Sequence, residues 1–116
     1  MKIALFGKRT QLTRPEFMEA FLRTSMQDGA EVHVHASFAR DMEGMDFTGA
    51  RMFTRAEEIT GADFAFTFGG DGTFLNTVRF LGAMGTRVLG VNSGRLGFLT
   101  SVSQERLPDA WAEIRK

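Results

Sequence analysis

The sequence contains no cysteine, and its charges cancel. Without cysteine there are no disulfide bonds and no thiolate metal sites, which fits a reducing cytoplasm. The 14 Lys and Arg residues balance the 14 Asp and Glu residues, and the basic residues are scattered along the chain. No nucleic-acid surface and no acidic-membrane surface is therefore predicted, and a small molecule is the expected partner.

The chain also lacks a long hydrophobic run. No segment approaches the length of a membrane-spanning helix, and the apolar run at residues 3–6 is too short for a signal peptide and has no cleavage-site pattern. We therefore expect a cytoplasmic protein with no membrane partner. Its 116 residues are enough for one hydrophobic core and too few for two ordinary ones. Residues 1–116 are predicted to form a single domain that folds alone.

Short apolar runs alternate with amphipathic segments along the chain. Strands are predicted at residues 3–6, 31–36, 62–68 and 87–91, and helices from Pro15 to the Asp28-Gly29 stop and at residues 55–60, 73–83 and 107–115. This alternation predicts an α/β fold, a doubly wound parallel sheet. Residues 38–53 show no clear periodicity and are interpreted as a loop or irregular segment. Phe74, Leu75, Val78 and Leu81 are predicted to form the apolar side of helix 73–83.

The most informative stretch is residues 64–80, where an apolar strand breaks at Gly69-Gly70-Asp71-Gly72-Thr73 and restarts as a helix. A helix N-terminus presents backbone N–H groups and a positive dipole, and glycines let a phosphate approach closely. Asp71 adds a carboxylate, which suits handling a proton or a metal ion, or accepting a hydrogen bond from a sugar hydroxyl. The alternatives are that Asp71 is only a helix N-cap, or that Asp71-Gly72 is a hairpin turn.

A second glycine-spaced stretch, residues 90–100, follows the next strand. Asn92 begins the loop after that strand, and Arg95 within the loop is a candidate anion contact. Phe98 either stacks on a ligand's ring or plugs the core. Ligands of doubly wound sheets bind beyond the carboxyl ends of the strands, so both stretches should meet at one edge. The Walker phosphate loop and the dinucleotide Gly-x-Gly-x-x-Gly are both absent.

Other polar residues give weaker signals. His33 and His35 share a strand face and could hold a metal, but no third ligand is evident, and a half-buried surface is the favoured interpretation. Lys8 and Arg9 follow the first strand and could meet a phosphate, although a solvated charge pair is favoured. Arg79 is expected on the exposed face of its helix.

The segments GGDGTFLNTVR and GVNSGRLGFLT together resemble the N-terminal domain of NAD kinases, with a Rossmann-like α/β sheet. Gly-Gly-Asp-Gly alone also occurs in diacylglycerol and sphingosine kinases and, followed by serine, in phosphofructokinases. Lipid kinases carry a Gly-Thr-x-Asn type segment after the next strand, whereas this chain has Asn-x-Gly-x-Leu-Gly-Phe. The resemblance covers mainly residues 63–100.

The resemblance implies transfer of the ATP γ-phosphoryl group to the 2′-hydroxyl of the adenosine ribose of NAD, which makes NADP. Asp71 would contact that ribose and act as general base, and a divalent cation, usually Mg²⁺, would neutralise charge. The remaining residues that the resemblance assigns to the nucleotide sites are Gly69, Gly70, Gly72 and Thr73 in the turn and Asn92, Leu96, Gly97 and Phe98 in the dinucleotide pocket. Some family members have a basic residue at the position of Asn76.

NAD kinases continue into a second, β-rich domain whose Asn-Glu or Asn-Asp motif grips the dinucleotide, and no such segment occurs before Lys116. We therefore expect a fragment with weak activity or none. Family members form homo-oligomers largely through parts absent here, so a monomer or weak dimer is expected. The choice between ATP and polyphosphate as donor, and between NAD and NADH as acceptor, stays open. A lipid or sugar kinase and a non-catalytic nucleotide-binding module remain the alternatives.

Overall fold

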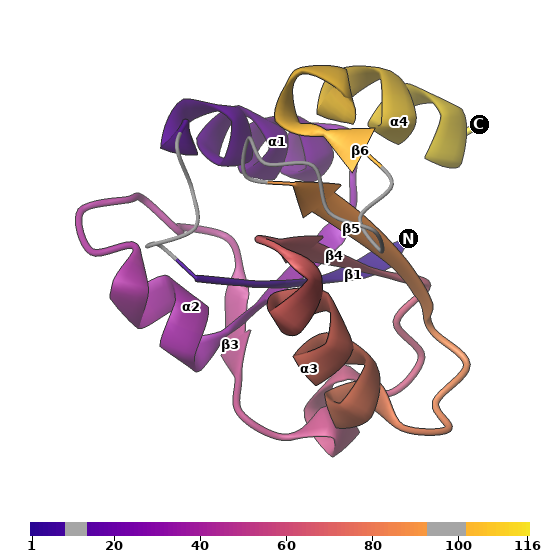
Figure 1. The fold of residues 1–116 in the computed structure, drawn as a ribbon. Helices are drawn as coiled ribbons and strands as arrows, with labels where there is room; N and C mark the ends of the chain where they lie inside the picture. Colours follow the sequence, from indigo (N-terminus) through magenta and orange to yellow (C-terminus); the bar gives the residue numbers. More distant parts are fainter. Residues whose placement is uncertain (9–13, 93–101) are drawn as a thin grey trace.

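The computed structural model describes residues 1–8, 14–92 and 102–116 (Figure 1). Its strands are β1 (Lys2–Gly7), β2 (Glu31–His35), β3 (Arg51–Phe53), β4 (Phe64–Phe68), β5 (Arg87–Asn92) and β6 (Val102–Ser103). Its α-helices are α1 (Pro15–Gln27), α2 (Ala36–Asp41), α3 (Asp71–Leu81) and α4 (Leu107–Ile114), and two short 3₁₀ helices are η2 (Ala56–Ile59) and η3 (Gln104–Arg106). Within the described residues, no helix is long and apolar enough to cross a membrane.

The strands form one six-stranded sheet in the order β3-β2-β1-β4-β5-β6, and every pair is parallel. The predicted α/β parallel sheet is thus confirmed. The chain leaves β1 toward β2 and β3, then returns to the other side of β1 and continues from β4 to β6. This reversal between β1 and β4 is the switch point at which ligands of open α/β sheets bind.

Helices cover both faces of the sheet, with α1 and α4 on one side and α3 on the other (Figure 1). The core under α1 and α4 contains Phe21, Phe66 and Trp111, whose rings pack against one another. The core under α3 contains Phe6 and Ile59. Strand β4 is buried on both faces, as its charge-free aromatic sequence predicts for a central parallel strand.

The interpretation of residues 38–53 as a loop is wrong in part. Helix α2 occupies Ala36–Asp41, and β3 at Arg51–Phe53 pairs with β2. Phe38 is fully buried and Met42 nearly so, which anchors α2 to the core. These elements are too short, at 6 and 3 residues, for a repeating apolar pattern to reveal them.

The predicted apolar side of α3 is also wrong in part, since Leu81 is buried as predicted and Leu75 and Val78 are not. Leu75 and Val78 are 43% and 41% exposed, whereas Thr73 and Thr77 are buried with Leu81. The Thr77 hydroxyl donates to the Thr73 carbonyl at 2.9 Å, so its burial leaves no unpaired hydroxyl. Small β-branched side chains therefore seat α3 on the sheet, and two larger aliphatic side chains face outward.

Candidate functional site

The turn between β4 and α3 is fixed by backbone hydrogen bonds on both sides. The Gly69 N–H donates to the Val91 carbonyl at 3.0 Å, which ties the turn to the end of β5. The first bond of α3 runs from the Phe74 N–H to the Gly70 carbonyl at 3.1 Å. The N–H of Gly72 precedes that bond and has no acceptor within the helix. The sheet thus presents a helix N-terminus at its carboxyl edge.

Two glycines of this turn are not required by the fold. A Cβ at Gly70 or Gly72 would meet no atom of residues 1–8, 14–92 and 102–116 within 4 Å, and neither glycine has a positive φ. Gly7 at the end of β1 is the opposite case, because a Cβ there would lie 2.8 Å from the Phe38 ring and from the Phe68 carbonyl oxygen. Glycine at positions 70 and 72 therefore leaves the backbone open to a ligand rather than relieving a clash.

Asp71 is the first residue of α3 and is partly exposed. The N-cap is Gly70, and no side chain makes a capping bond there. The hairpin alternative for Asp71 is therefore wrong, because a helix follows the turn, and the N-cap position belongs to Gly70 instead of Asp71. Its carboxylate stands in the first turn, where the helix dipole favours negative charge.

The residues of α3 fall on two different surfaces. Asp71, Leu75 and Val78 follow i, i+4, i+7 spacing and share one face, so the two exposed aliphatic side chains lie in line with the carboxylate. Sequence reasoning missed this stripe because it assigned both residues to the core. The spacing itself was visible, and it would have linked them to Asp71.

The other surface of α3 forms one wall of a groove of about 170 Å³ at the carboxyl ends of β1 and β2. The described residues that line it are Phe6, Gly7, Lys8, His35, Ser37, Thr73, Asn76, Thr77 and Phe80. Asn76 thus contributes to this groove, while Arg79 is exposed as expected.

His35 is held in the groove by its neighbours. Its Nδ1 accepts a hydrogen bond from the Ser37 N–H at 3.1 Å, which caps α2. The centre of its ring lies 5.3 Å from the centres of the Phe53 and Phe80 rings and 5.9 Å from the centre of the Phe6 ring. Burial lowers the pKa of His35 below its ordinary value, because desolvation penalises the imidazolium.

His33 has a different partner from His35. Its Nε2 lies 2.7 Å from Oε2 of Glu31, and this hydrogen bond lowers the pKa of the Glu31 carboxyl. Among residues 1–8, 14–92 and 102–116, no group of three His, Cys, Asp or Glu side chains could hold a metal ion. The two histidines therefore have separate structural surroundings.

The second predicted site segment is described only at its start. Asn92 is the last residue of β5 and is partly exposed, one residue beyond the Val91 carbonyl that holds Gly69. The turn and Asn92 thus share the carboxyl edge, as predicted. Arg95, Leu96, Gly97 and Phe98 lie outside the described residues, and their assignments stay predictions.

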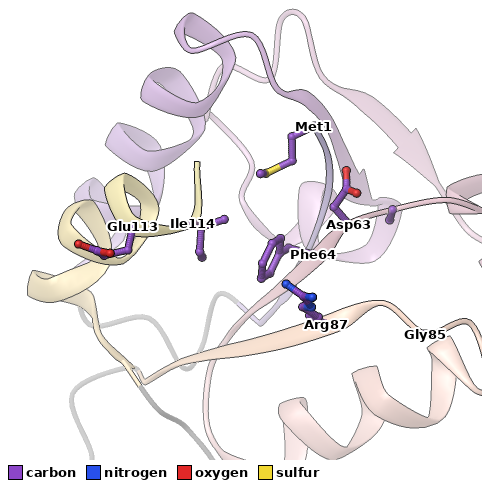
Figure 2. Close-up of a pocket in the computed structure, with 8 residues that line it drawn as sticks. Met1, Asp63, Phe64, Gly85, Arg87, Glu113 and Ile114 are labelled. Atoms are coloured by element: carbon purple, nitrogen blue, oxygen red, sulfur yellow. The ribbon is translucent and has the colours of Figure 1, made fainter. Parts of the chain in front are cut away.

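A larger hollow, of about 910 Å³, lies at the opposite edge of the sheet (Figure 2). Figure 2 shows Phe64 and Arg87 close together, with Glu113 and Ile114 coming from α4. Asp63 also lines it, and its carboxylate accepts a hydrogen bond from the Lys2 N–H at 2.8 Å. Asp63 precedes β4, and Phe64 and Arg87 are the first residues of β4 and β5, so the hollow lies at the amino edge of the sheet.

A family model and the sequences of known proteins place this chain with the same group of relatives. The family model of the ATP-NAD kinase N-terminal domain matches residues 7–116. The NAD kinase of Bacteroides fragilis is 32% identical over 119 residues, which cover 98% of this chain and 40% of that protein. The NAD kinase of Aromatoleum aromaticum is 41% identical over 116 residues, which cover 97% of this chain and 37% of that protein.

A solved structure has the same fold. The crystal structure of yeast NADH kinase complexed with NADH matches with a TM-score of 0.74 at 21% identity, over 98% of this chain and 35% of that one. The chain thus spans about 40% of the length of the Bacteroides relative. From the family model and these relatives, the chain belongs to the ATP-NAD kinase N-terminal domain family.

Proposed function

We propose that this chain supplies the catalytic carboxylate and the phosphate-side turn of an NAD kinase, which makes NADP from NAD and ATP. The observation that carries the proposal is Asp71 at the start of α3, between Gly70 and Gly72, at both of which the described structure has room for a side chain. Membership of the ATP-NAD kinase N-terminal domain family supports the choice of reaction.

In this proposal the acceptor is the 2′-hydroxyl of the adenosine ribose of NAD. Its oxygen bonds to the γ-phosphorus as the bond from that phosphorus to the β-phosphate oxygen breaks, and the hydroxyl proton passes to the Asp71 carboxylate. General base catalysis of this kind contributes roughly 10²–10⁴-fold, and positioning contributes much of the rest. ADP is the leaving product.

The surrounding residues have distinct proposed tasks. Gly69, Gly70, Gly72 and Thr73 hold the turn open toward the phosphates. Asn92 contacts the dinucleotide from the end of β5, and Leu96, Gly97 and Phe98 line its pocket. The exposed stripe of Leu75 and Val78 gives the acceptor an apolar surface beside Asp71.

Magnesium fits this arrangement as a companion of the donor. Mg²⁺ is commonly bound largely through substrate phosphates, so in this proposal it would arrive with ATP, and no residue of this chain is assigned to it. When bound, the cation would neutralise charge on the phosphates. The Asp71 carboxylate would then remain available as the proton acceptor.

We further propose that this chain is part of a longer kinase, since it spans about 40% of the Bacteroides relative. The rest of the dinucleotide site would then come from a β-rich domain. In that case the isolated chain is a monomer or weak dimer with little turnover, and the complete enzyme is a cytoplasmic homo-oligomer.

The test is NADP formation from NAD, ATP and Mg²⁺ by this chain alone and fused to the remaining part of the Bacteroides fragilis NAD kinase. Product from the fusion that disappears with Asp71→Asn supports the proposal. Full turnover by the isolated chain contradicts the fragment hypothesis. Folded fusions that make no NADP but phosphorylate diacylglycerol or a sphingoid base assign the chain to a lipid kinase instead. Parallel reactions with polyphosphate and with NADH identify the donor and acceptor.

A further inference from the structure

One buried hydroxyl next to the catalytic turn has no hydrogen-bond partner. Thr67, the fourth residue of β4, is fully buried, and its Oγ1 bonds to no group in the described part of the chain. Two other buried hydroxyls are paired, since Ser25 donates to the Leu22 carbonyl at 3.0 Å and Thr77 donates to the Thr73 carbonyl at 2.9 Å. An unpaired hydroxyl in such a place calls for an explanation.

The Thr67 side chain lies between the sheet and α3. Side chains alternate along β4, so Phe66 enters the core under α1 and α4, whereas Ala65 belongs to the core under α3. Thr67 shares the face of Ala65, and α3 covers this face of the sheet (Figure 1). Thr73 and Thr77 are the buried threonines with which α3 sits on it. The unpaired hydroxyl thus lies under the helix that carries the proposed base.

Stability alone does not account for this hydroxyl. A hydroxyl that is buried without a partner costs free energy, because its hydrogen bonds to water are lost and not replaced. Valine has nearly the same shape as threonine, has no polar side-chain atom and is favoured in strands. Thr67→Val would therefore remove the cost and keep the packing. A group that lowers stability in this way is typical of a functional site.

Thr67 also lies beside the segment of β5 that fixes the catalytic turn. Its register partner on β5 is Gly90, and the next residue, Val91, accepts the Gly69 N–H at 3.0 Å. Because Gly90 has no side chain, no side chain of β5 separates Thr67 from α3 at this register position. The helix itself is therefore the nearest source of a partner for the hydroxyl.

Helix α3 is anchored more firmly at its end than at its start. At its end, Leu81 is buried, and the Phe80 ring packs against two other phenylalanine rings whose centres lie 5.4 and 5.9 Å away. Its start is seated by the short side chains of Thr73 and Thr77. Fewer packed atoms hold the start, so a small movement there disrupts less dispersion energy than a movement of the end. Such a movement would shift Asp71.

We propose that Thr67 is a positioning residue for the Asp71 carboxylate. When nucleotide binds, the start of α3 settles toward β4, and the Thr67 hydroxyl donates to a backbone carbonyl in the first two turns of α3. This bond holds Asp71 in line with the acceptor hydroxyl. Hydrogen bonds of active sites often become well aligned only in the substrate complex. The inference rests on the proposed kinase function, and Thr67 itself touches no substrate.

Crystal structures of the fusion enzyme without nucleotide and with NAD test the bond directly. We expect the Thr67 Oγ1 to have no partner in the first structure and to lie within about 3 Å of a carbonyl oxygen of α3 in the second. A water molecule bonded to Oγ1 in both structures overturns the proposal. An unpartnered hydroxyl in the NAD complex overturns it as well.

Two variants separate the hydroxyl from the shape of the side chain. In the fusion enzyme, Thr67→Val should raise the urea midpoint of unfolding without nucleotide, yet lower kcat about fivefold, as for one lost hydrogen bond. Thr67→Ser keeps the hydroxyl and should retain kcat within about twofold, although the lost methyl group lowers the midpoint. A merely structural role would move stability and kcat in the same direction. A lower midpoint or an unchanged kcat for Thr67→Val overturns the proposal.

Ser25→Ala is the control, because it removes a buried hydroxyl that is already paired within α1. It should leave kcat unchanged and should not raise the urea midpoint. NADP formation that is insensitive to Thr67→Val contradicts the positioning role alone. A fusion that binds NAD but makes no NADP in any variant contradicts the proposed function, and the two crystal structures then still decide whether the Thr67 hydroxyl bonds to α3.

Discussion

The two edges of the parallel sheet differ in what their residues already bind. At the amino edge, the hollow of about 910 Å³ is bordered by groups engaged with one another. The backbone N–H and side-chain carboxylate of Asp63 both bond to Lys2 at 2.8 Å, and the Lys2 ammonium group donates to the Thr60 carbonyl at 2.9 Å. The Arg87 guanidinium lies 5.8 Å from the centre of the Phe64 ring.

At the carboxyl edge, the groove has a volume of only about 170 Å³, but a helix begins beside it. Two glycines leave the backbone of that first turn open, and a histidine is fixed with its proton on Nε2. The difference teaches that strand direction and a helix N-terminus, more than the volume of a hollow, make the carboxyl edge the better candidate for a ligand site.

The strongest test of this comparison replaces one aspartate beyond each end of β4, in separate variants. Asp71→Asn removes the proposed base and should lower NADP formation by the fusion enzyme about 10²-fold or more. Asp63→Asn keeps an oxygen acceptor for the Lys2 N–H at the amino edge and should change the rate less than about twofold. Initial rates at saturating substrates, with circular dichroism as the check of folding, decide between them. Equal losses in the two variants would contradict the distinction between the edges.

A pair of glycine substitutions separates packing from ligand access within the carboxyl edge. Gly7→Ala places a Cβ 2.8 Å from the Phe38 ring and should lower the free energy of unfolding by about 1–3 kcal/mol. Gly72→Ala meets no atom within 4 Å and should leave that free energy unchanged or raise it by up to about 1 kcal/mol. We expect Gly72→Ala nevertheless to lower NADP formation about tenfold, because its methyl group occupies space for phosphate. Urea unfolding and initial rates provide the two measurements, and a fully active Gly72→Ala would refute the ligand-access argument.

A contact near the amino edge should affect stability without affecting chemistry. The Trp111 Nε1–H donates to Asp28 Oδ2 at 2.8 Å and joins α4 to the end of α1, while Arg115 pairs with the same carboxylate at 3.4 Å. Trp111→Phe keeps an aromatic ring but loses this bond, so the free energy of unfolding should fall by about 1–2 kcal/mol. The KM values and turnover of the fusion enzyme should not change. Lys116→Ala, which removes only an exposed pair with Glu113, is the control for unfolding.

The sequence predicted the parallel sheet because its strongest signals are local. Residues 64–68 contain three phenylalanines and no charged residue, and Pro15 and Gly29 bound α1 as expected. The turn around Asp71 was predictable for the same reason, since strand, glycines and helix follow one another directly. The position of Asn92 at the same edge then followed from parallel strand direction.

The sequence predictions were wrong where tertiary packing overrides the local hydrophobic pattern. Hydrophobicity placed Leu75 and Val78 in the core, but Thr73 and Thr77 seat α3 because small side chains let the helix approach the sheet. The surroundings of His35 were equally hidden, because its partner Ser37 and the rings of Phe6, Phe53 and Phe80 come together only in the folded chain. Such non-local arrangements leave no periodic signal in a single sequence.

The smallest expected effect is a pH dependence of stability from the carboxyl edge. Burial lowers the pKa of His35 in the folded state, so below about pH 6.5 the unfolded chain binds more protons at this residue than the folded chain does. The stabilising contribution of the neutral ring is therefore complete above pH 6.5 and is lost as the pH falls through the lowered folded pKa.

His35→Asn keeps an acceptor for the Ser37 N–H and cannot titrate, so between pH 7 and 5 it should lose less stability than the unmodified chain. Urea midpoints at four or five pH values for both proteins measure the difference. His33→Asn is the matched control on the same strand, and it should leave the contribution of His35 intact. Parallel curves for the unmodified chain and His35→Asn would mean that the groove accommodates the imidazolium.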